Sequence, residues 1–240
     1  MKKIKINNAL LTKYYILPYK DYQDCFNIFN AFTGKQYKFI KVLKNNQRSY
    51  VELFEYENKK YVIKIPTEKN KRKWIRFTTL FRKGEAERAL DNMQNILNMG
   101  LLTTIPVLLY EKWTLGFLTN SYYIYEYSEA TPVTEEYYTD VIKILEFLHK
   151  NNFLHHDAHL DNFLVKNGKI FLLDANLKKM FLFKKFKSYY EFIYLSEMNP
   201  EIQASLNINK SCLNYKLALI YHNYIKNWRR FKKFIRGNKK

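Results

Sequence analysis

Three polar residues in the second half of the chain have the types and the spacing that phosphoryl transfer requires. Asp157 lies in the run HHDAHLDN, Asn162 ends that run, and Asp174 closes the run KIFLLD. Transfer of a phosphoryl group from ATP needs a carboxylate that orients the acceptor hydroxyl and takes its proton. It also needs an amide and a second carboxylate that hold Mg²⁺ on the phosphates. The pattern favours a catalytic base at Asp157 and metal ligands at Asn162 and Asp174 over a polar loop with scattered acids.

A β-hairpin is predicted between this loop and the last acid. Asn167-Gly168 is a strong signal for a two-residue turn, and the apolar run KIFLL that follows it is typical of a strand. We expect the order loop, strand, turn, strand. Asp157 and Asn162 then lie on the loop, and Asp174 lies just past the second strand.

Three histidines surround the predicted base. His159 stands where protein kinases carry a lysine that contacts the transferred phosphate, so we predict that it contributes electrostatically to catalysis. His155 is predicted to be structural and to hydrogen-bond the backbone near the Asp174 turn. A zinc site made of His155, His156 and His159 is disfavoured, because their spacing fits the loop better and no cysteine lies nearby.

An alternating strand upstream carries the lysine that a kinase needs for the phosphates. The run KYVIKI at 60–65 places Lys64 on the same face as Val62. We predict that Lys64 holds the α- and β-phosphates of ATP. The competing interpretation is a solvated strand lysine.

The turn between two further predicted strands, 36–43 and 50–56, is the expected place for a loop that covers the phosphates. This turn, KNNQRS at 44–49, contains no glycine, so the pattern G-x-G-x-x-G is absent. We expect backbone N–H groups, together with Arg48 and Ser49, to cover the phosphates instead.

A helix is predicted to begin near Gly84-Glu85 and to end at Gly100. Glu85 lies at the edge of its apolar stripe, whereas Glu87 lies further towards the polar face. We therefore choose Glu85 as the acid that orders Lys64. The alternative is that both glutamates are ordinary first-turn acids favoured by the helix dipole.

Two apolar and aromatic strands, 105–111 and 121–127, are predicted around a turn at Leu115-Gly116. Glu126 and Tyr127 at the end of the second strand suit a hinge whose backbone hydrogen-bonds the adenine edge. A helix that ends at His149 then leads into the catalytic loop.

These elements together predict an α+β, protein-kinase-like fold with two lobes. Residues 1–127 would form an N-terminal extension and an N-lobe with an antiparallel sheet, and residues 128–240 a short, mainly helical C-lobe. Only 66 residues follow Asp174, and they contain no A-P-E-like element. Protein kinases hold peptides with a much longer C-lobe, so the short one favours a small-molecule or glycan acceptor.

The composition limits the classes of binding partner and the cellular compartment that we expect. The 240 residues carry a net charge of +19, which attracts anions such as nucleic acid, anionic lipid or phosphorylated glycan. Two cysteines, Cys25 and Cys212, fit a reducing cytoplasm better than a disulfide scaffold. No secretory signal and no run of 18 apolar residues is visible, so we expect a cytoplasmic protein.

The C-terminal segment concentrates the charge. No acid occurs from Ile202 to Lys240, and that segment holds ten Lys or Arg. Apolar residues at helical spacing trace one stripe through it: Leu217, Ile220, Tyr221, Tyr224, Trp228, Phe231 and Ile235. Two interpretations stay open, a helix packed on the core with a solvated basic face, and a helix that also touches an anionic membrane surface.

The chain resembles a known family, the lipopolysaccharide core heptose kinases, over roughly residues 36 to 230. The resemblance rests on KYVIKIP at 60–66, KNKRKWIRFTTLFRKGE at 69–85, HHDAHLDN at 155–162 and LLDAN at 172–176. The loop itself is shared with aminoglycoside-type phosphotransferases. Two departures occur: His156 stands where glycine or arginine is usual, and Ala175-Asn176 replaces the phenylalanine-glycine of protein kinases, which makes a Phe-driven switch unexpected.

The resemblance implies ATP- and Mg²⁺-dependent phosphorylation of a heptose in the lipopolysaccharide inner core. The glycan would be the partner, with the anionic inner face of the cytoplasmic membrane as a second partner through the basic C-terminus, and no nucleic acid is expected. The alternatives are an atypical protein or small-molecule kinase of the same fold, and a non-catalytic basic module that binds membrane or nucleic acid.

Overall fold

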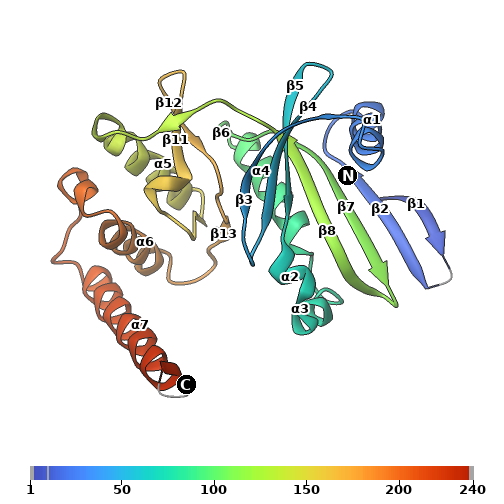
Figure 1. Ribbon diagram of the computed structural model, residues 1–240. Coiled ribbons are helices and arrows are strands. Elements are labelled where there is room, and N and C mark those ends of the chain that lie inside the picture. The colour runs from blue at the N-terminus through green and yellow to red at the C-terminus, as the bar shows by residue number, and fades with distance from the viewer. Residues whose placement is uncertain (1–2, 10, 238–240) are drawn as a thin grey trace. The chain divides into compact units, whose positions relative to one another are not determined.

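The computed structural model describes residues 3–9 and 11–237, and the chain separates into two compact units, Met1–Glu129 and Ala130–Lys240 (Figure 1). The first is a sheet with helices, and the second is mainly helical with short strands. The α+β class expected from the sequence is confirmed. No helix of the described residues is both long enough and apolar enough to cross a membrane.

The first unit is built on a seven-stranded sheet in the order β1-β2-β7-β8-β5-β4-β3, in which every neighbouring pair is antiparallel. Its strands are β1 (Ile4–Ala9), β2 (Thr12–Pro18), β3 (Lys38–Asn45), β4 (Tyr50–Tyr56), β5 (Lys59–Ile65), β7 (Pro106–Thr114) and β8 (Phe117–Glu126). The other elements are α1 (Tyr22–Thr33), α2 (Thr67–Lys71), α3 (Lys73–Thr78), α4 (Glu85–Asn98) and the short β6 (Leu102–Thr103).

The strands predicted for 36–43, 50–56 and 60–65 are β3, β4 and β5, and those predicted for 105–111 and 121–127 are β7 and β8. The turn predicted at Leu115-Gly116 is present, with φ of 53° and 80°. The sequence did not reveal that β1, β2 and α1 belong to this unit. The two strands extend the sheet beside β7, and they are not an appendage outside it.

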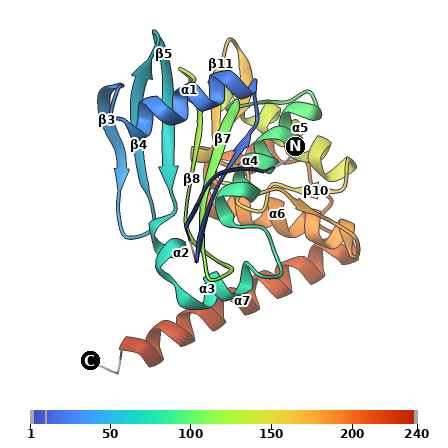
Figure 2. The same ribbon diagram turned by 90° about the vertical axis from the view of Figure 1, so that its right-hand side faces the viewer.

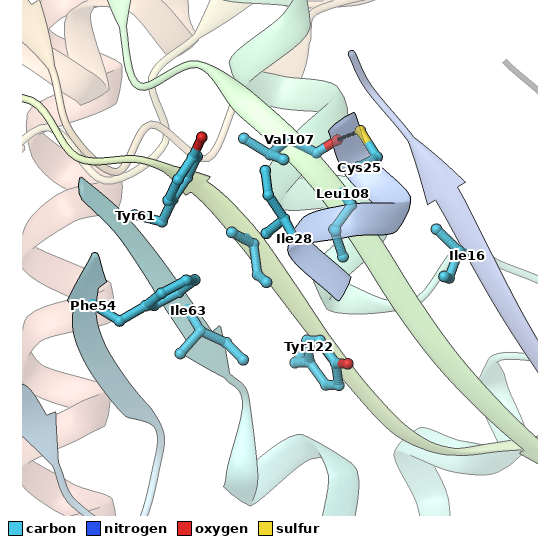
Figure 3. Close-up of a cluster of buried hydrophobic side chains, with 10 residues drawn as sticks. Ile16, Cys25, Ile28, Phe54, Tyr61, Ile63, Val107, Leu108 and Tyr122 are labelled. Atoms are coloured by element: carbon cyan, nitrogen blue, oxygen red, sulfur yellow. Dashed lines mark hydrogen bonds between the residues drawn. The ribbon is translucent and has the colours of Figure 1, made fainter. Parts of the chain in front are cut away.

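Helix α1 covers one face of the sheet and α4 the other (Figure 2). Asp21 caps α1, because its side chain accepts hydrogen bonds from the N–H groups of Gln23 and Asp24. Under α1 lies a core that includes Phe54, Ile63 and Tyr122, and the Cys25 thiol donates to the carbonyl of Val107 across 3.1 Å (Figure 3). These residues alternate along their strands with residues that face α4.

Helix α4 approaches the sheet closely where it begins. A Cβ on Gly84 would lie 2.6 Å from Leu118 Cδ2 and 3.5 Å from Glu111 Oε1, so no larger residue fits there without movement. Ala86, Leu90 and Met93 then pack against Leu109 and Tyr123. The helix predicted after Gly84 is confirmed, and its start is fixed by this contact.

The second unit surrounds a small antiparallel ladder in which β11 pairs with both β12 and β9. Its elements are β9 (Thr131–Pro132), η1 (Glu135–Tyr137), α5 (Tyr138–Lys150), β10 (Phe153–Leu154), η2 (Leu160–Asn162), β11 (Phe163–Lys166), β12 (Lys169–Leu172), β13 (Lys178–Lys179), α6 (Lys184–Met198), η3 (Pro200–Ser205) and α7 (Leu213–Gly237). The apolar face of α5 is buried, and β10 pairs with β13.

Helix α7 packs differently from the sequence-based expectation. All seven residues of the predicted apolar stripe are 44% to 65% exposed. The helix buries Ala218 and His222, and Glu197 of α6 forms an ion pair with Lys226 and a hydrogen bond with the His222 ring. Of the predicted stripe, Tyr221 does pack on α6, where its ring lies 5.8 Å from that of Phe186 and 5.5 Å from that of Tyr190. The expected packing of Leu217–Tyr224 is therefore found only in part within the described residues.

Candidate active site

The β11–β12 hairpin brings Asn162 and Asp174 to one end of a ladder. Asn167 and Gly168 have φ of 51° and 70°, as a two-residue hairpin turn of the predicted kind requires. Phe163 pairs with Leu172, and the N–H of Leu173 donates to the carbonyl of Asn162 across 3.0 Å. Asn162 thus lies opposite Leu173, the residue immediately before Asp174, at the same end of the ladder.

The loop that precedes the hairpin adds Asp157 to this pair. The Asn162 side-chain amide donates to the Asp157 carbonyl at 2.8 Å and lies 3.4 Å from its carboxylate Oδ2. Asp157 is exposed, so an acceptor can reach its carboxylate. Because the Asn162 nitrogen faces Asp157, its amide oxygen is directed elsewhere and is available as a ligand.

A buried glutamate on α6 binds the backbone of this loop through hydrogen bonds. Glu191 is 5% exposed, and its carboxylate accepts from the N–H of His156 at 2.6 Å and from the N–H of His155 at 3.2 Å. The same carboxylate lies 2.8 Å from Nε2 of His149 on α5. Asn199 adds a long hydrogen bond of 3.4 Å from the N–H of Leu160. The Glu191 carboxylate would be costly to bury alone, and the two N–H groups and the His149 ring stabilise it.

Sequence reasoning missed Glu191. The signal available was a single acid in the aromatic and aliphatic run YYEFIYL of residues 189–195, since a charged residue inside such a run is either exposed on a helix or buried with partners. The strained φ of 66° at His156 marks the position where the anchored loop turns.

His155 is buried, as predicted for a structural histidine. Neither ring nitrogen has a partner at normal hydrogen-bond geometry within the part of the chain that the structure describes, although the backbone of Asp157 is close enough to favour a higher pKa of the ring. The ring instead packs against Phe163 with 4.9 Å between centroids. Burial lowers the pKa of His155, against the opposing effect of the Glu191, Asp157 and Asp174 carboxylates, so its imidazole is held neutral.

His159 caps the short helix η2. Its Nδ1 accepts from the N–H of Asp161 at 3.3 Å and lies 3.3 Å from the Asp161 carboxylate. When Nδ1 accepts a hydrogen bond in the neutral ring, the proton resides on Nε2, which is then a donor. This arrangement leaves His159 able to donate to an anionic group from Nε2.

In the first unit, Lys64 lies on the face of the sheet that α4 covers. It pairs across the sheet with Val51 of β4 and Tyr123 of β8, and Tyr123 packs against α4. Neighbours across a ladder point to the same side. Glu85 is the first residue of α4, so both members of the predicted pair belong to this face, and each makes an interaction within the protein.

The predicted burial order of the two acids on α4 is wrong. Glu87 is 6% exposed, whereas the Glu85 side chain is 32% exposed and lies 3.7 Å from Arg88. Glu87 is buried because Lys3 approaches within 2.7 Å and also binds Glu111 at 2.8 Å. A helical wheel of α4 cannot predict the burial of Glu87, because the cation that pairs with it, Lys3, is far from α4 in the sequence.

The glycine-free turn before β4 is closed by its own side chain. Asn46 Oδ1 accepts from the N–H groups of Arg48 at 2.9 Å and Ser49 at 3.0 Å. These two N–H groups are therefore not available to phosphates, which corrects the expectation that they cover the nucleotide. Ser49 is 7% exposed, whereas Arg48 is exposed and its side chain can approach an anion.

The predicted hinge also uses its backbone donors internally. The N–H of Glu126 donates to Ile105 at 2.9 Å and the N–H of Tyr127 to Lys60 at 3.0 Å. The Glu126 carboxylate pairs with Lys20, and the Lys60 ammonium lies 5.9 Å from the Tyr127 ring centroid. Only carbonyl oxygens of Glu126 and Tyr127 could then accept a hydrogen bond from an adenine.

The donor set at the hairpin fits Mg²⁺ better than a transition metal. No group of three or more His, Cys, Asp or Glu that could hold a metal ion occurs among residues 3–9 and 11–237. Mg²⁺ is commonly bound by one or two carboxylates while phosphates and water supply the remaining oxygens. An amide oxygen of Asn162 and a carboxylate of Asp174 match that requirement.

Comparison with known proteins gives a consistent result. The family model described as "Lipopolysaccharide core biosynthesis protein (WaaY)" matches residues 5–237. The lipopolysaccharide core heptose(II) kinase WaaY of Escherichia coli (strain K12) is 27% identical over 160 residues, which are 64% of this chain and 69% of that relative.

Solved structures are more distant. A structure of WaaP in complex with acyl carrier protein is 12% identical, covering 90% of this chain and 97% of that one, with a TM-score of 0.49. A thermostable mutant of aminoglycoside phosphotransferase APH(4)-Ia in complex with ADP and hygromycin B is 9% identical, covering 72% and 79%, with a TM-score of 0.42. The family match over nearly the whole chain decides the assignment: this protein belongs to the WaaY family of lipopolysaccharide core biosynthesis proteins.

Proposed function

We propose that this protein is an ATP-dependent kinase that phosphorylates a heptose of the lipopolysaccharide inner core. The observation that carries the proposal is the contact between Asp157 and Asn162 at the end of the hairpin where Asp174 leaves the second strand, in a chain of the WaaY family. The E. coli relative is named as a kinase of heptose(II). A base, an amide and a second acid in this arrangement supply what phosphoryl transfer demands of a protein.

Asp157 is the base. Its carboxylate orients the acceptor hydroxyl and takes its proton as the hydroxyl oxygen bonds to the γ-phosphorus and the bond to the bridging oxygen of ADP breaks. Asn162 and Asp174 hold Mg²⁺, which neutralises charge on the phosphates when bound. His159 donates from Nε2 to the transferred group. Glu191 fixes the backbone on which the base lies.

The nucleotide is held by the first unit. Lys64 binds the α- and β-phosphates and is ordered by Glu85, while Arg48 provides a cation over them and Ser49 supports the turn. Carbonyl oxygens of Glu126 and Tyr127 accept from the adenine amino group. What supports this is the shared face of Lys64 and α4 and the exposed position of Arg48.

Phosphorylation can be tested with purified protein, ATP and Mg²⁺, with and without deacylated lipopolysaccharide core. We expect ADP formation to depend on the core and the product to gain one phosphate by mass spectrometry. A protein that turns over ATP only with peptides or unrelated sugars would support the alternative kinase functions. A protein that binds no ATP would support the non-catalytic basic module.

We further propose that α7 places the enzyme on the anionic inner face of the cytoplasmic membrane. Trp228, Phe231 and Phe234 are 44%, 52% and 67% exposed beside Arg229, Arg230 and Lys233. Basic residues near an anionic surface contribute about 1 kcal/mol each, and exposed aromatic side chains add an apolar part that salt does not screen.

Vesicle sedimentation tests this second proposal. We expect the double variant Phe231→Ser and Phe234→Ser to bind anionic vesicles more weakly than wild type at high salt, with unchanged activity on soluble core. Leu11→Ser, which alters an apolar residue that is 59% exposed in the first unit, is the matched control. Vesicle binding that is equal in all three proteins would refute the membrane role.

A further inference from the structure

A cavity of about 550 Å³ lies beside the predicted base, and all of its lining residues belong to the second unit. The loop contributes His156 and Asp157, and β13, α6 and α7 contribute the other walls. Its volume lies in the range of pockets that take small molecules. The position of Asp157 in the lining makes this cavity the place where an acceptor hydroxyl can meet the base.

Four cations surround the cavity: Lys178 and Lys179 of β13, Lys187 of α6 and Arg229 of α7. In the described part of the chain, none of these four forms an ion pair with an acid, whereas Lys226, one turn before Arg229, pairs with Glu197. Lining cations that the protein does not neutralise favour a bound anion.

The two acids in the lining, Asp157 and Glu191, do not neutralise these four cations. Glu191 is committed to the N–H groups of His155 and His156 and to the His149 ring. Asp157 must stay accessible to act as a base. The positive charge of the four cations is therefore left for a negatively charged ligand to neutralise.

Tyrosines form the remaining wall and link α6 to α7. The rings of Tyr190 and Tyr221 are 5.5 Å apart, and both line the cavity. Burial raises the pKa of Tyr190 while the Arg229 guanidinium opposes the shift, which agrees with their proximity. Aromatic side chains with polar tips beside cations suit a ligand that combines sugar faces with charged groups.

We propose that this cavity is the acceptor pocket and that Lys187 and Arg229 form a subsite in it for an oxyanion, a phosphate or a carboxylate, carried by the acceptor sugar. The proposal rests on the proposed kinase function, because it assigns the acceptor side of that reaction. Tyr221 and Arg229 are two helical turns apart and share one side of α7. This side of α7, with Tyr221 from the apolar stripe and Arg229 from the basic set, thus completes the acceptor site.

Calorimetric titration with deacylated core, in the absence of ATP, measures the subsite directly. We expect Arg229→Gln and Lys187→Gln each to raise Kd roughly tenfold, the loss of one charge-assisted hydrogen bond. Lys216→Gln and Lys185→Gln are matched controls, since each alters an exposed lysine on the same helix that does not line the cavity. The controls should change Kd less than about twofold.

Two modified acceptors identify the source of the oxyanion. One core has its phosphates removed and the other has its carboxylates reduced to alcohols. Wild type should bind the core that lacks the recognised group roughly tenfold more weakly, and on that core the two variants should match wild type. If wild type binds both modified cores with the same Kd as the intact core, the proposal is overturned.

Turnover separates this proposal from the kinase function on which it rests. If Arg229→Gln and Lys187→Gln phosphorylate core with the same KM as their controls, the subsite is wrong and the kinase function stands. If wild type binds core through these two residues but never phosphorylates it, the subsite stands and the kinase function is wrong. A wild-type protein that binds no core overturns the subsite.

Discussion

The loop that carries Asp157 in the second unit and the turn at 44–49 in the first unit are stabilised in opposite ways. The loop at His155–Asn162 takes its main restraint from Glu191, a buried carboxylate on a helix that follows it by about thirty residues in the chain. The turn at 44–49 is closed by Asn46, which accepts from two N–H groups within the turn itself.

This contrast shows which part of the site must be rigid. A base must stay within hydrogen-bond reach of the acceptor, and a displacement of about 1 Å can cost 10²-fold in rate. A remote, buried anchor provides that precision for Asp157. The turn has only to present a cation over the phosphates, and a side chain within the turn is sufficient for that purpose.

The largest effect is expected where the base itself is removed. Asp157→Ala should lower turnover by roughly 10²–10⁴, the range for a lost general base, with little change in ATP affinity. Asp140→Ala, which removes an exposed acid paired with Lys143 at 2.9 Å, serves as the control. Near-normal turnover of Asp157→Ala in the core assay would eliminate the assigned role.

Removal of the anchor should reproduce part of that loss without touching the base. Glu191→Ala leaves the N–H groups of His155 and His156 without this acceptor, and the buried N–H of His155 alone should cost about 1–3 kcal/mol in the free energy of unfolding. Urea denaturation measures this cost, and Glu201→Ala, an exposed acid of the same unit, is the control.

A positioning role for Glu191 also predicts a kinetic split. At a temperature where the variant is folded, kcat should fall while the Kd for ATP stays constant, because Asp157 is misplaced and the nucleotide is held elsewhere. Loss of stability with unchanged kcat would reduce Glu191 to a purely structural residue and weaken the contrast between the loop and the turn.

The same contrast explains what the sequence could predict. The hairpin, the strands and α4 follow from local patterns: Asn167-Gly168 specifies its turn, and strand alternation assigns Lys64 to the face of Tyr123. Local signals also suffice to place Asn162 and Asp174 at the same end of the hairpin, since its register puts Asn162 opposite Leu173. These parts required no knowledge of distant contacts.

Features that depend on distant partners were not predictable. Glu87 is buried because it pairs with Lys3, which precedes β1 and lies 84 positions away in the chain. Glu191 likewise binds the backbone of a loop that lies about thirty residues before it in the chain. On α7 only Tyr221 of the predicted stripe packs on α6, and the buried Ala218 and His222 were not predicted because they carry a weaker apolar signal. Burial against a partner cannot be read from the periodicity of one helix.

After the changes at Asp157 and Glu191, removal of the metal should have the next largest effect. In wild type, Mg²⁺-ATP at about 100 times its Kd should add roughly 2.7 kcal/mol to the free energy of unfolding. Asp174→Ala should abolish the Mg²⁺-dependent part of this stabilisation, and EDTA should do the same in wild type. Thermal unfolding with ATP, with and without Mg²⁺, measures both. The absence of any shift in wild type at millimolar Mg²⁺-ATP would contradict nucleotide binding.

The buried His155 predicts a smaller dependence on pH. Because its pKa is lowered in the folded protein, the unfolded chain takes up this proton first. The contribution to stability is complete above about pH 6.5 and is lost as pH falls below it, by at most about 1.4 kcal/mol per pH unit. His155→Phe, which keeps a ring against Phe163, should show a shallower loss between pH 7 and 5 in urea titrations. An identical slope in both proteins would show that His155 does not couple folding to protons.

The smallest effect is expected in the turn, where the restraint is local and exposed. Asn46→Ala removes the acceptor for the N–H groups of Arg48 and Ser49 and should cost about 0.5–1.5 kcal/mol of stability. Asn46→Gly also removes the acceptor, but it frees both N–H groups to bind phosphate and permits the backbone conformations of a glycine-rich loop. We therefore expect Asn46→Gly to bind ATP at least as tightly as wild type, and Asn46→Asp, which keeps the acceptor and adds a negative charge beside the phosphates, to bind it more weakly. ATP titration by calorimetry distinguishes the three variants. Equal ATP affinity in Asn46→Gly and Asn46→Asp would mean that this turn does not cover the phosphates, and that the nucleotide is held by Lys64 and its neighbours without it.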